Sequence, residues 1–452
     1  MAGKKVVILD GCGLPDGDLA PALDGLLDVF RRDGSEIETF HLHEMKLAHC
    51  LGCFNCWLKT PGMCVEDDAG RQVAQAVIRS DTTVLFTPVT FGGYAPDLKK
   101  MMDRFVQLIS PYFLMDHGEV HHLERYARRP RLVMVGLQRH ANSHEAHIFK
   151  TLAGRNAINL RPPSYAAEVV VATDGAETLR RQFEGLLTRS DALPFGEAAA
   201  SLMPPPLVSG AAAGPDIRKR ALLIVGSPKT SSVSTSNVLG SYLLERLGER
   251  GWETESLKLM ASLSRPEGEA ALLESIDRAG LMLLVFPLYV DALPYLVTKA
   301  LTTIATARRA TANPRPLRLA AVVNSGFPET HQNSMALAIC REFAAQSGMA
   351  WCGGLALGGG GAVGEQPLTA PKRSGLSVDH VIRALDLTAA ALSEGLPVPA
   401  EAVRFMAKSP VPFLPFALWR WIYLRFGDKG FEQLAARNGV SRERMLAQPY
   451  AT

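Results

Sequence analysis

Apolar and polar positions recur along the chain in two similar series. The first series starts with the apolar run 4–11 and the second with the run 219–226, and each run ends in glycine. A polar loop, a helical pattern and a short alternating strand follow in both series. The helical patterns and second strands lie at 19–32 and 36–42 in the first series and at 237–250 and 253–259 in the second. We therefore expect a duplicated unit.

Further apolar runs complete both series, and most of them are continuous in Val, Ile and Leu. Such runs, alternating with helices, are typical of parallel sheets that are covered on both faces. The sequence thus predicts an α/β chain with two tandem doubly wound parallel sheets, whose ligands bind beyond the carboxyl ends of the strands. The third to fifth strands are expected at 84–88, 131–138 and 168–173 in the first series, and at 283–287, 317–325 and 348–357 in the second.

The composition divides the chain into four parts. We expect a first domain at 1–190, a linker rich in Pro, Ala and Gly at 191–216, a second domain at 217–398 and a helical tail at 399–452. The tail contains the aromatic stretch 413–426, which is too short to span a bilayer. This stretch could lie on a membrane surface, or it could clamp the two domains or a second subunit.

Composition and charge exclude several classes of protein. The 452 residues are 47% hydrophobic and 21% charged, with a net charge of +3, which is typical of a globular protein. The chain contains no basic arm that would indicate nucleic-acid binding. It also contains no apolar run that would indicate a transmembrane segment or a signal peptide. Seven cysteines, mostly clustered, argue against a disulfide framework. We therefore expect a cytoplasmic protein.

Four of the seven cysteines occur within fifteen residues. Cys50, Cys53, Cys56 and Cys64 have the spacing C-x2-C-x2-C-x7-C. Gly11 and Pro88 are 77 positions apart, whereas the matching Gly226 and Pro287 of the second series are 61 apart. The first series therefore contains 16 more residues over this stretch, and we interpret the cysteine loop as an insertion. The spacing favours a [4Fe-4S] cluster, with zinc or ordinary free thiols as the alternatives.

The loop after the first strand differs between the two series. The second loop, 227–237, is dense in Ser and Thr and leads into a helix, so hydroxyls, helix-end N–H groups and a lysine could bind a phosphate. Ordinary helix capping is the alternative, and a Walker A motif is absent. The first loop, 11–18, has no hydroxyl and contains two aspartates, which would repel a phosphate.

Loops after the third and fourth strands of the second series contain aromatic residues. Tyr289 follows the third strand and Phe327 the fourth, and a flat heteroaromatic ring binds between such apolar walls and a few polar groups. Packing at the rim is the alternative for either residue alone. Together with the phosphate loop, these loops favour FMN. In the first series, the polar stretch 118–126 is expected to be a solvated loop, with a metal or substrate site as the alternative.

These motifs resemble the flavodoxin-like NAD(P)H-dependent FMN reductases, and specifically the iron-sulfur flavoproteins, once in each half. The residues that carry the resemblance are Gly-Ser-Pro-Lys at 226–229 with its Ser/Thr run, Pro-Leu-Tyr at 287–289, and the cysteine spacing. The resemblance implies tandem flavodoxin-like domains that bind FMN and a [4Fe-4S] cluster. It assigns the phosphate to Ser227, Lys229, Ser232, Ser234, Thr235 and Ser236, the ring to Pro287, Leu288, Tyr289, Asn324 and Gly326, and the iron to Cys50, Cys53, Cys56 and Cys64.

The resemblance also implies an oxidoreductase. FMN would accept a hydride from NAD(P)H and pass single electrons to the cluster, and then to an unknown small-molecule or protein acceptor. No catalytic acid or base is assigned. Because the cysteines lie in the first half and the hydroxyl loop in the second, we expect one cofactor on each domain, and a homo-oligomer is possible. The alternatives are an FMN-dependent quinone or azo-type reductase without a cluster, and a non-catalytic scaffold with a zinc or empty cysteine loop.

Overall fold

The computed structural model describes residues 3–194, 218–229, 233–371 and 376–451. Most of the expected linker 191–216 lies outside these residues. The chain forms two compact units, the first made of Met1–Phe195 with Leu424–Thr452 and the second of Gly196–Tyr423. The C-terminal segment is thus shared between the units. Its long helix, α15 (Phe416–Ala436), belongs to the second unit up to Tyr423 and to the first unit from Leu424.

The first unit is built on a sheet of five parallel strands in the order β2-β1-β3-β7-β8. This is the flavodoxin-like order, in which the chain reverses direction across the sheet between its first and third strands. The side chains of β1 are buried on both faces from Val6 onward, as the continuous apolar run predicts. The strands are β1 (Lys5–Asp10), β2 (Glu36–His41), β3 (Thr82–Thr90), β7 (Arg131–Gln138) and β8 (Tyr165–Val171), and the short β4 (Gly93–Tyr94) pairs antiparallel with β3.

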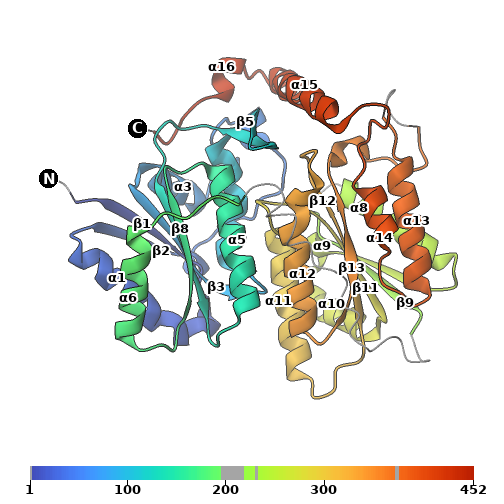
Figure 1. Ribbon diagram of the computed structural model, residues 1–452, viewed down its shortest axis with the longest axis horizontal. Helices are drawn as coiled ribbons and strands as arrows, with labels where there is room; N and C mark the ends of the chain where they lie inside the picture. The colour runs from blue at the N-terminus through green and yellow to red at the C-terminus, as the bar shows by residue number, and fades with distance from the viewer. Residues whose placement is uncertain (1–2, 195–217, 230–232, 372–375, 452) are drawn as a thin grey trace. The chain divides into compact units, whose positions relative to one another are not determined.

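Helices cover both faces of this sheet (Figure 1). Two of them, α1 and α6, pack side by side on one face, where Leu26 and Phe183 join the strand residues of one apolar cluster. The other face is covered by α5, whose Phe149 lies against Gly136 of β7. The helices are η1 (Leu14–Leu19), α1 (Ala20–Arg32), η2 (Leu42–Glu44), α2 (Asn55–Leu58), α3 (Ala69–Arg79), α4 (Pro96–Met102), η3 (Asp103–Leu108), α5 (Ser143–Leu160), α6 (Ala176–Thr188) and the C-terminal α16 (Arg442–Met445).

The prediction of a solvated loop at 118–126 was wrong. These residues belong to an antiparallel hairpin of β5 (Ile109–Asp116) and β6 (Glu119–Glu124). Glu119 and His121 are almost fully buried, and Glu119 accepts hydrogen bonds from Arg155 of α5 at 2.6 Å and pairs with the His121 ring at 3.1 Å. The polar residues were misread because buried ionic groups satisfy one another here rather than bonding to water.

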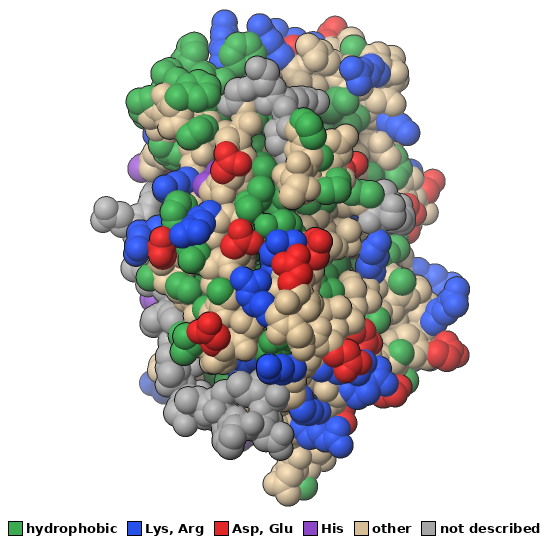
Figure 2. Space-filling view, turned by 90° about the vertical axis from the view of Figure 1, so that its right-hand side faces the viewer, with side chains coloured by type: hydrophobic (Ala, Val, Ile, Leu, Met, Phe, Trp, Pro, Cys, Tyr) green, Lys and Arg blue, Asp and Glu red, His purple; other side chains and the backbone are tan. Residues whose placement is uncertain are grey.

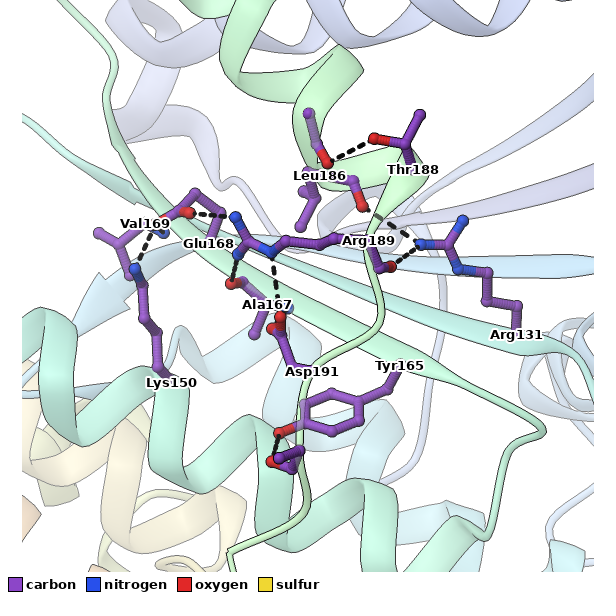
Figure 3. Close-up of polar contacts among 12 residues, drawn as sticks. Arg131, Lys150, Tyr165, Ala167, Glu168, Val169, Leu186, Thr188, Arg189 and Asp191 are labelled. Carbon is purple, nitrogen blue, oxygen red and sulfur yellow. Dashed lines mark hydrogen bonds and ion pairs between the residues drawn. The ribbon is translucent and has the colours of Figure 1, made fainter.

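The edge strand β8 is covered by the segment that follows α6 (Figure 3). Arg189 pairs with Glu168 of β8 at 2.8 Å and with Asp191 at 3.0 Å, and Asp191 in turn accepts the Ala167 N–H at 2.8 Å. Lys150 of α5 also pairs with Glu168. An uncovered edge strand would present free N–H and C=O groups to other chains, and this segment occupies part of that edge.

The second unit repeats the same strand order. Its five parallel strands run β10-β9-β11-β12-β13, and their registers are continuous except for one irregularity at Leu319/Ala320. The two sheets confirm the predicted tandem flavodoxin-like α/β fold, with strand ends within a few residues of those expected. The strands are β9 (Arg220–Val225), β10 (Glu253–Lys258), β11 (Leu281–Pro287), β12 (Arg318–Asn324) and β13 (Ala350–Leu357).

Helices again cover both faces in the second unit (Figure 1). Residues of α8, α13 and α14 share one apolar cluster with Leu223, Leu283 and other strand residues. On the opposite face, α11 packs beside α12. Among the described residues, no helix is long and apolar enough to cross a bilayer. The helices are α8 (Thr235–Gly248), α9 (Leu259–Ser262), α10 (Pro266–Arg278), α11 (Tyr295–Ala310), η4 (Thr330–Asn333), α12 (Ser334–Gln346), η5 (Gly360–Ala362), α13 (Asp379–Ser393) and α14 (Ala400–Met406).

Candidate cofactor sites

The hydroxyl-rich loop of the second unit begins at Gly226, directly after β9. A Cβ atom at this position would lie 2.3 Å from Val297 of α11 and 2.8 Å from Phe286 of β11, so only glycine allows the chain to leave the sheet here. The loop then enters α8 at Ser234, whose side chain caps the helix by accepting the Asn237 N–H at 3.2 Å. Of the expected phosphate residues, Ser232 lies outside the described residues.

The other expected phosphate residues divide into buried and exposed groups. Ser227 and Ser236 are buried, and the Ser236 hydroxyl donates to Asn324 Oδ1 at 2.7 Å, which joins the start of α8 to the end of β12. The Thr235 hydroxyl donates to the Gly360 carbonyl at 3.4 Å. Lys229 is exposed and its ammonium group lies 3.3 Å from the carboxylate of Glu365. Three of the six residues, Ser234, Thr235 and Ser236, thus lie at the N-terminus of one helix.

The loops expected to border a flavin ring meet at the neighbouring strand ends. The Leu288 N–H donates to the Asn324 carbonyl at 2.9 Å, which ties the loop after β11 to the loop after β12. Tyr289 begins a tight turn in which its N–H and C=O bond to Ala292 at 3.0 and 3.1 Å. Pro287 is the last residue of β11, and the exposed Gly326 follows β12, where its carbonyl accepts the Tyr423 hydroxyl at 3.0 Å.

Two features of this edge were not predicted. Val290 and Asp291 adopt left-handed backbone conformations, with φ of 51° and 55°, in a turn that usually contains glycine or asparagine. Because a β-branched residue is strained there, this turn stores energy next to Tyr289. The glycine run 358–361 also folds tightly: the Gly359 and Gly360 N–H groups donate to the carbonyls of Phe327 and Ser325 at 2.7 and 2.8 Å.

The equivalent loop of the first unit is closed by its own carboxylates. The Cys12 N–H donates to Asp10 and the Gly13 N–H to Asp16, both at 3.0 Å. Arg139 binds Asp16 at 3.0 Å and Asp18 at 2.8 Å, and its hydrogen bonds hold the pKa of Asp18 below the usual value. Two N–H groups and a cation that could face a bound phosphate are thus used within the loop.

The cysteine loop lies between β2 and α3, where the second unit has only the short helix α9. Cys56 is buried in α2, Cys53 is exposed, and Cys50 and Cys64 are half-buried. Burial raises the pKa of the Cys50 thiol to about 12, with a further contribution from Asp103, and the Gly52 N–H points at its sulfur at 3.5 Å. Burial also raises the pKa of Cys56 well above its usual value.

Hydrogen bonds from the body of the first unit fix the shape of this loop. The Cys64 N–H donates to Gln107 at 2.8 Å, and the Trp57 ring donates to the carbonyls of Val106 and Ile109 at 3.0 Å. Behind the loop, Asp68 caps α3 and accepts both the Ala48 N–H at 2.7 Å and the buried guanidinium of Arg104 at 2.6 Å.

The C-terminal segment covers the cysteine loop, and no sequence signal predicted this contact. Pro449 packs on Gly62, where an added Cβ would lie 2.5 Å from the proline ring. The buried Arg125 donates to the carbonyls of Met445 and Ala447 at 2.7 and 2.8 Å, and the Tyr450 hydroxyl donates to Gln107 at 3.3 Å. From α15, Phe431 packs edge-on against Trp57, with ring centres 5.3 Å apart.

The donor set of the loop suits an iron-sulfur cluster in type, because four cysteine thiols are the ligands that such a cluster takes. After burial, the charges of Cys50, Cys64 and Cys53 help to raise the pKa of Cys56, so these thiols are neighbours in the loop. Within the described residues, no three His, Cys, Asp or Glu side chains lie close enough to hold a single metal ion. A cubane cluster takes one thiolate for each iron, which spaces the four sulfurs more widely than a single-ion site does.

Comparison with known proteins finds a likeness between the first unit and one family. Its residues 5–171 match the family model described as NADPH-dependent FMN reductase. The matched residues include the cysteine loop and the acidic loop 11–18. The second unit resembles the first in its strand order.

Curated relatives and solved structures resemble parts of the chain. Two iron-sulfur flavoproteins of Methanocaldococcus jannaschii are each 31% identical, one over 100 residues (22% of this chain and 51% of the relative) and one over 83 residues (18% and 41%). The chain therefore spans about half the length of these relatives or less. An NAD(P)H:quinone oxidoreductase from Methanothermobacter marburgensis has 13% identity and a TM-score of 0.34, and the match covers 41% of this chain and 100% of that protein. An azoreductase from Bacillus anthracis has 12% identity and a TM-score of 0.27, and covers 39% and 98%.

Proposed function

We propose that the chain is an NAD(P)H-dependent FMN oxidoreductase of the iron-sulfur flavoprotein type, in which the second unit binds FMN and the first unit binds a [4Fe-4S] cluster. The observation that carries this division is the contrast between the two equivalent loops. In the loop 11–18 of the first unit, two N–H groups donate to the carboxylates of Asp10 and Asp16, whereas the loop of the second unit leads through Ser234 to a helix N-terminus.

In the second unit, the residues around α8 would bind the FMN phosphate. The N–H groups at the start of a helix favour an anion, and Ser227, Ser234 and Thr235 supply hydroxyls close to them. Lys229 would exchange its pairing with Glu365 for the phosphate. Ser236 would act by holding Asn324, and Ser232 completes the assigned set. The ring would lie against Pro287, Leu288, Tyr289, Asn324 and Gly326.

In the first unit, Cys50, Cys53, Cys56 and Cys64 would ligate the iron. When bound, FMN accepts electron pairs from a nicotinamide and the cluster carries them singly, so that an acceptor of unknown identity, small molecule or protein, receives one electron at a time. The chain itself fixes the shape of the loop through Gln107 and Trp57, and it limits water at Cys56 by burial.

A second candidate function is FMN-dependent reduction of a quinone or azo compound without a cluster. It is favoured by the lack, among residues the structure describes, of a grouping that would hold a metal ion. In that case the four thiols would stay free.

We place the reaction in the cytoplasm, since none of the seven cysteines forms a disulfide. In a homo-oligomer, a second copy of the chain would contribute a surface to the same reaction.

Counting cofactors on anaerobically purified protein tests the proposal. We expect one FMN and four iron atoms for each chain, following the cofactor stoichiometry of a single cluster. Cys53→Ser should lose iron and retain FMN, whereas Cys12→Ser, outside the cysteine loop, should retain both. Two FMN for each chain would overturn the division of the cofactors. FMN without iron would support the second candidate, and a colourless protein would refute both.

A further inference from the structure

The exposed apolar side chains of this protein are concentrated in one segment. Six of the thirteen large hydrophobic side chains that are exposed among the described residues lie between Phe413 and Leu434. The most exposed are Phe413 at 69%, Trp421 at 58% and Phe426 at 57%. Figure 2 shows hydrophobic side chains gathered at the upper end of that view, with Lys and Arg side chains beside them. Exposed apolar patches of this kind mark interaction surfaces.

Helix α15 has one packed row and one exposed row. Tyr423, Gly427, Phe431 and Ala435 follow at intervals of four, and they lie against other parts of their own units: Tyr423 bonds to Gly326, and Gly427 lies against Phe113. The exposed row, Trp421, Arg425 and Lys429, has the same interval and projects from a different side of the helix. The helix is therefore amphipathic, with an aromatic and basic exposed side.

Basic residues predominate in this segment. Residues 402–429 contain Arg404, Lys408, Arg420, Arg425 and Lys429, and Asp428 is their one acidic residue. The Asp428 carboxylate accepts the Phe113 N–H at 3.0 Å. Arg404, Lys408 and Arg425 are exposed, and the ammonium group of Lys429 lies over the Phe426 ring at 5.7 Å. A surface that combines exposed Trp and Phe with Arg and Lys matches the phosphate and acyl boundary of an anionic bilayer.

We propose that the exposed side of α15 binds the surface of an anionic phospholipid bilayer. Trp421 and Phe426 would enter the boundary between headgroups and acyl chains, and Arg425 and Lys429 would pair with lipid phosphates. The protein lies on the membrane and does not cross it, because no described helix is long and apolar enough to do so. The inference is independent of the proposed function, since the surface contains none of the cofactor residues.

Co-sedimentation with vesicles tests the proposal on the full chain. We expect binding to vesicles of equal parts phosphatidylglycerol and phosphatidylcholine, weak or no binding to phosphatidylcholine alone, and a decrease as salt is added, because the attraction to anionic lipid is screened. Equal binding to both vesicle types, or binding to neither, would overturn the proposal.

Matched variants separate the contributions of charge and apolar area. The double variant Arg425→Glu with Lys429→Glu should lower partitioning about tenfold or more, whereas Arg250→Glu, an exposed arginine elsewhere in the second unit, should not change it. Trp421→Ala should lower partitioning about tenfold, whereas Leu396→Ser, which removes a side chain that is 52% exposed, should not. Far-ultraviolet circular dichroism of each variant confirms that it is folded.

Self-association is the competing use of this surface. Size-exclusion chromatography of the wild type and of Trp421→Ala, without lipid, reports on it directly. If the wild type is a dimer that Trp421→Ala dissociates, and neither protein binds anionic vesicles, a second copy of the chain covers the aromatic side and the lipid proposal is wrong. An unchanged oligomeric state together with loss of vesicle binding by the variant supports the lipid surface.

Discussion

The two units share one strand order and differ at the loop after the first strand. In the first unit this loop contains Asp16 and Asp18 and is closed by Arg139, while in the second it contains Ser227 and leads into α8 at Ser234. The glycine that opens the loop fulfils the same steric need in both: an added Cβ would lie 2.6 Å from Leu98 at Gly11 and 2.3 Å from Val297 at Gly226.

This comparison shows which features follow from the fold and which follow from the site. Both loops must pass between a strand and the helix packed on it, and glycine provides that passage whatever the loop binds. The side chains that follow are free to differ. One unit has used that freedom to satisfy its own N–H groups, and the other to place hydroxyls at a helix end.

The largest expected effect concerns the cysteine loop, which only the first unit contains. Asp68→Ala leaves the buried guanidinium of Arg104 without its carboxylate and removes the cap of α3, so it should destabilise the first unit by about 3–5 kcal/mol. Hydrogen exchange, measured separately for the amides of β1 and of β9, should show lower protection in β1 only. Asp67→Ala is the control, since the Asp67 side chain is 84% exposed and its pairing with Arg71 should contribute less than about 1 kcal/mol.

Exchanging the charge of the second loop for that of the first should weaken the phosphate binding that we propose for it. Ser234→Asp keeps a good helix cap but places a carboxylate beside the bound phosphate, and FMN affinity should fall about a hundredfold or more. Fluorescence titration of the apoprotein with FMN measures it. Ser234→Thr should bind FMN nearly normally, and Asp16→Ser in the first unit should leave one FMN for each chain. Unchanged affinity in Ser234→Asp would place the phosphate elsewhere.

Gly62 tests the contact between the cysteine loop and the C-terminal segment. It has φ of 84°, and a Cβ there would collide with Pro449, so Gly62→Ala should cost about 2–3 kcal/mol and increase alkylation of Cys64. Gly34→Ala separates the two effects because Gly34 has φ of 70° with no atom within 4 Å of its Cβ position. That variant should cost about 1 kcal/mol and leave thiol reactivity unchanged.

The turns after the third strands provide a smaller test. Val290 has φ of 51° in the second unit, and asparagine tolerates this conformation better, so Val290→Asn should stabilise the second unit by about 1 kcal/mol in urea unfolding. Phe91, with φ of 55°, has the matching place in the first unit, but its ring is buried. Phe91→Asn should therefore destabilise, because lost burial exceeds the strain that is relieved.

The smallest effect concerns acid stability. Burial would raise the pKa of Asp68, but the Ala48 N–H, the Arg104 guanidinium and the Gly70 N–H together hold it below the usual value. A lowered pKa means that the ionised group stabilises the folded state above about pH 4, and that this contribution is lost as the pH falls through the folded pKa. Protection of β1 amides should decrease over that range in the wild type and vary less in Asp68→Asn.

The sequence by itself determined the fold and indicated which residues could bind the cofactors. Continuous apolar runs that end in glycine or proline specify buried parallel strands, since period and burial are local properties of the chain. For the same reason the insertion at Cys50–Cys64 and the contrast between the loops 11–18 and 227–237 could be read directly. The hairpin at 109–124 was missed because Glu119 meets His121 and Arg155 only after folding.

Only the tertiary structure decided what lies against these motifs. No local pattern indicates that Pro449 and Tyr450 pack at the cysteine loop, that Ser236 bonds to Asn324, or that Arg139 closes the acidic loop. These partners are separated from their targets by 88 to 387 positions, the separations of Ser236–Asn324 and Gly62–Pro449. Contacts at such separation depend on how the sheets bring loop ends together, and a single sequence contains no record of that arrangement.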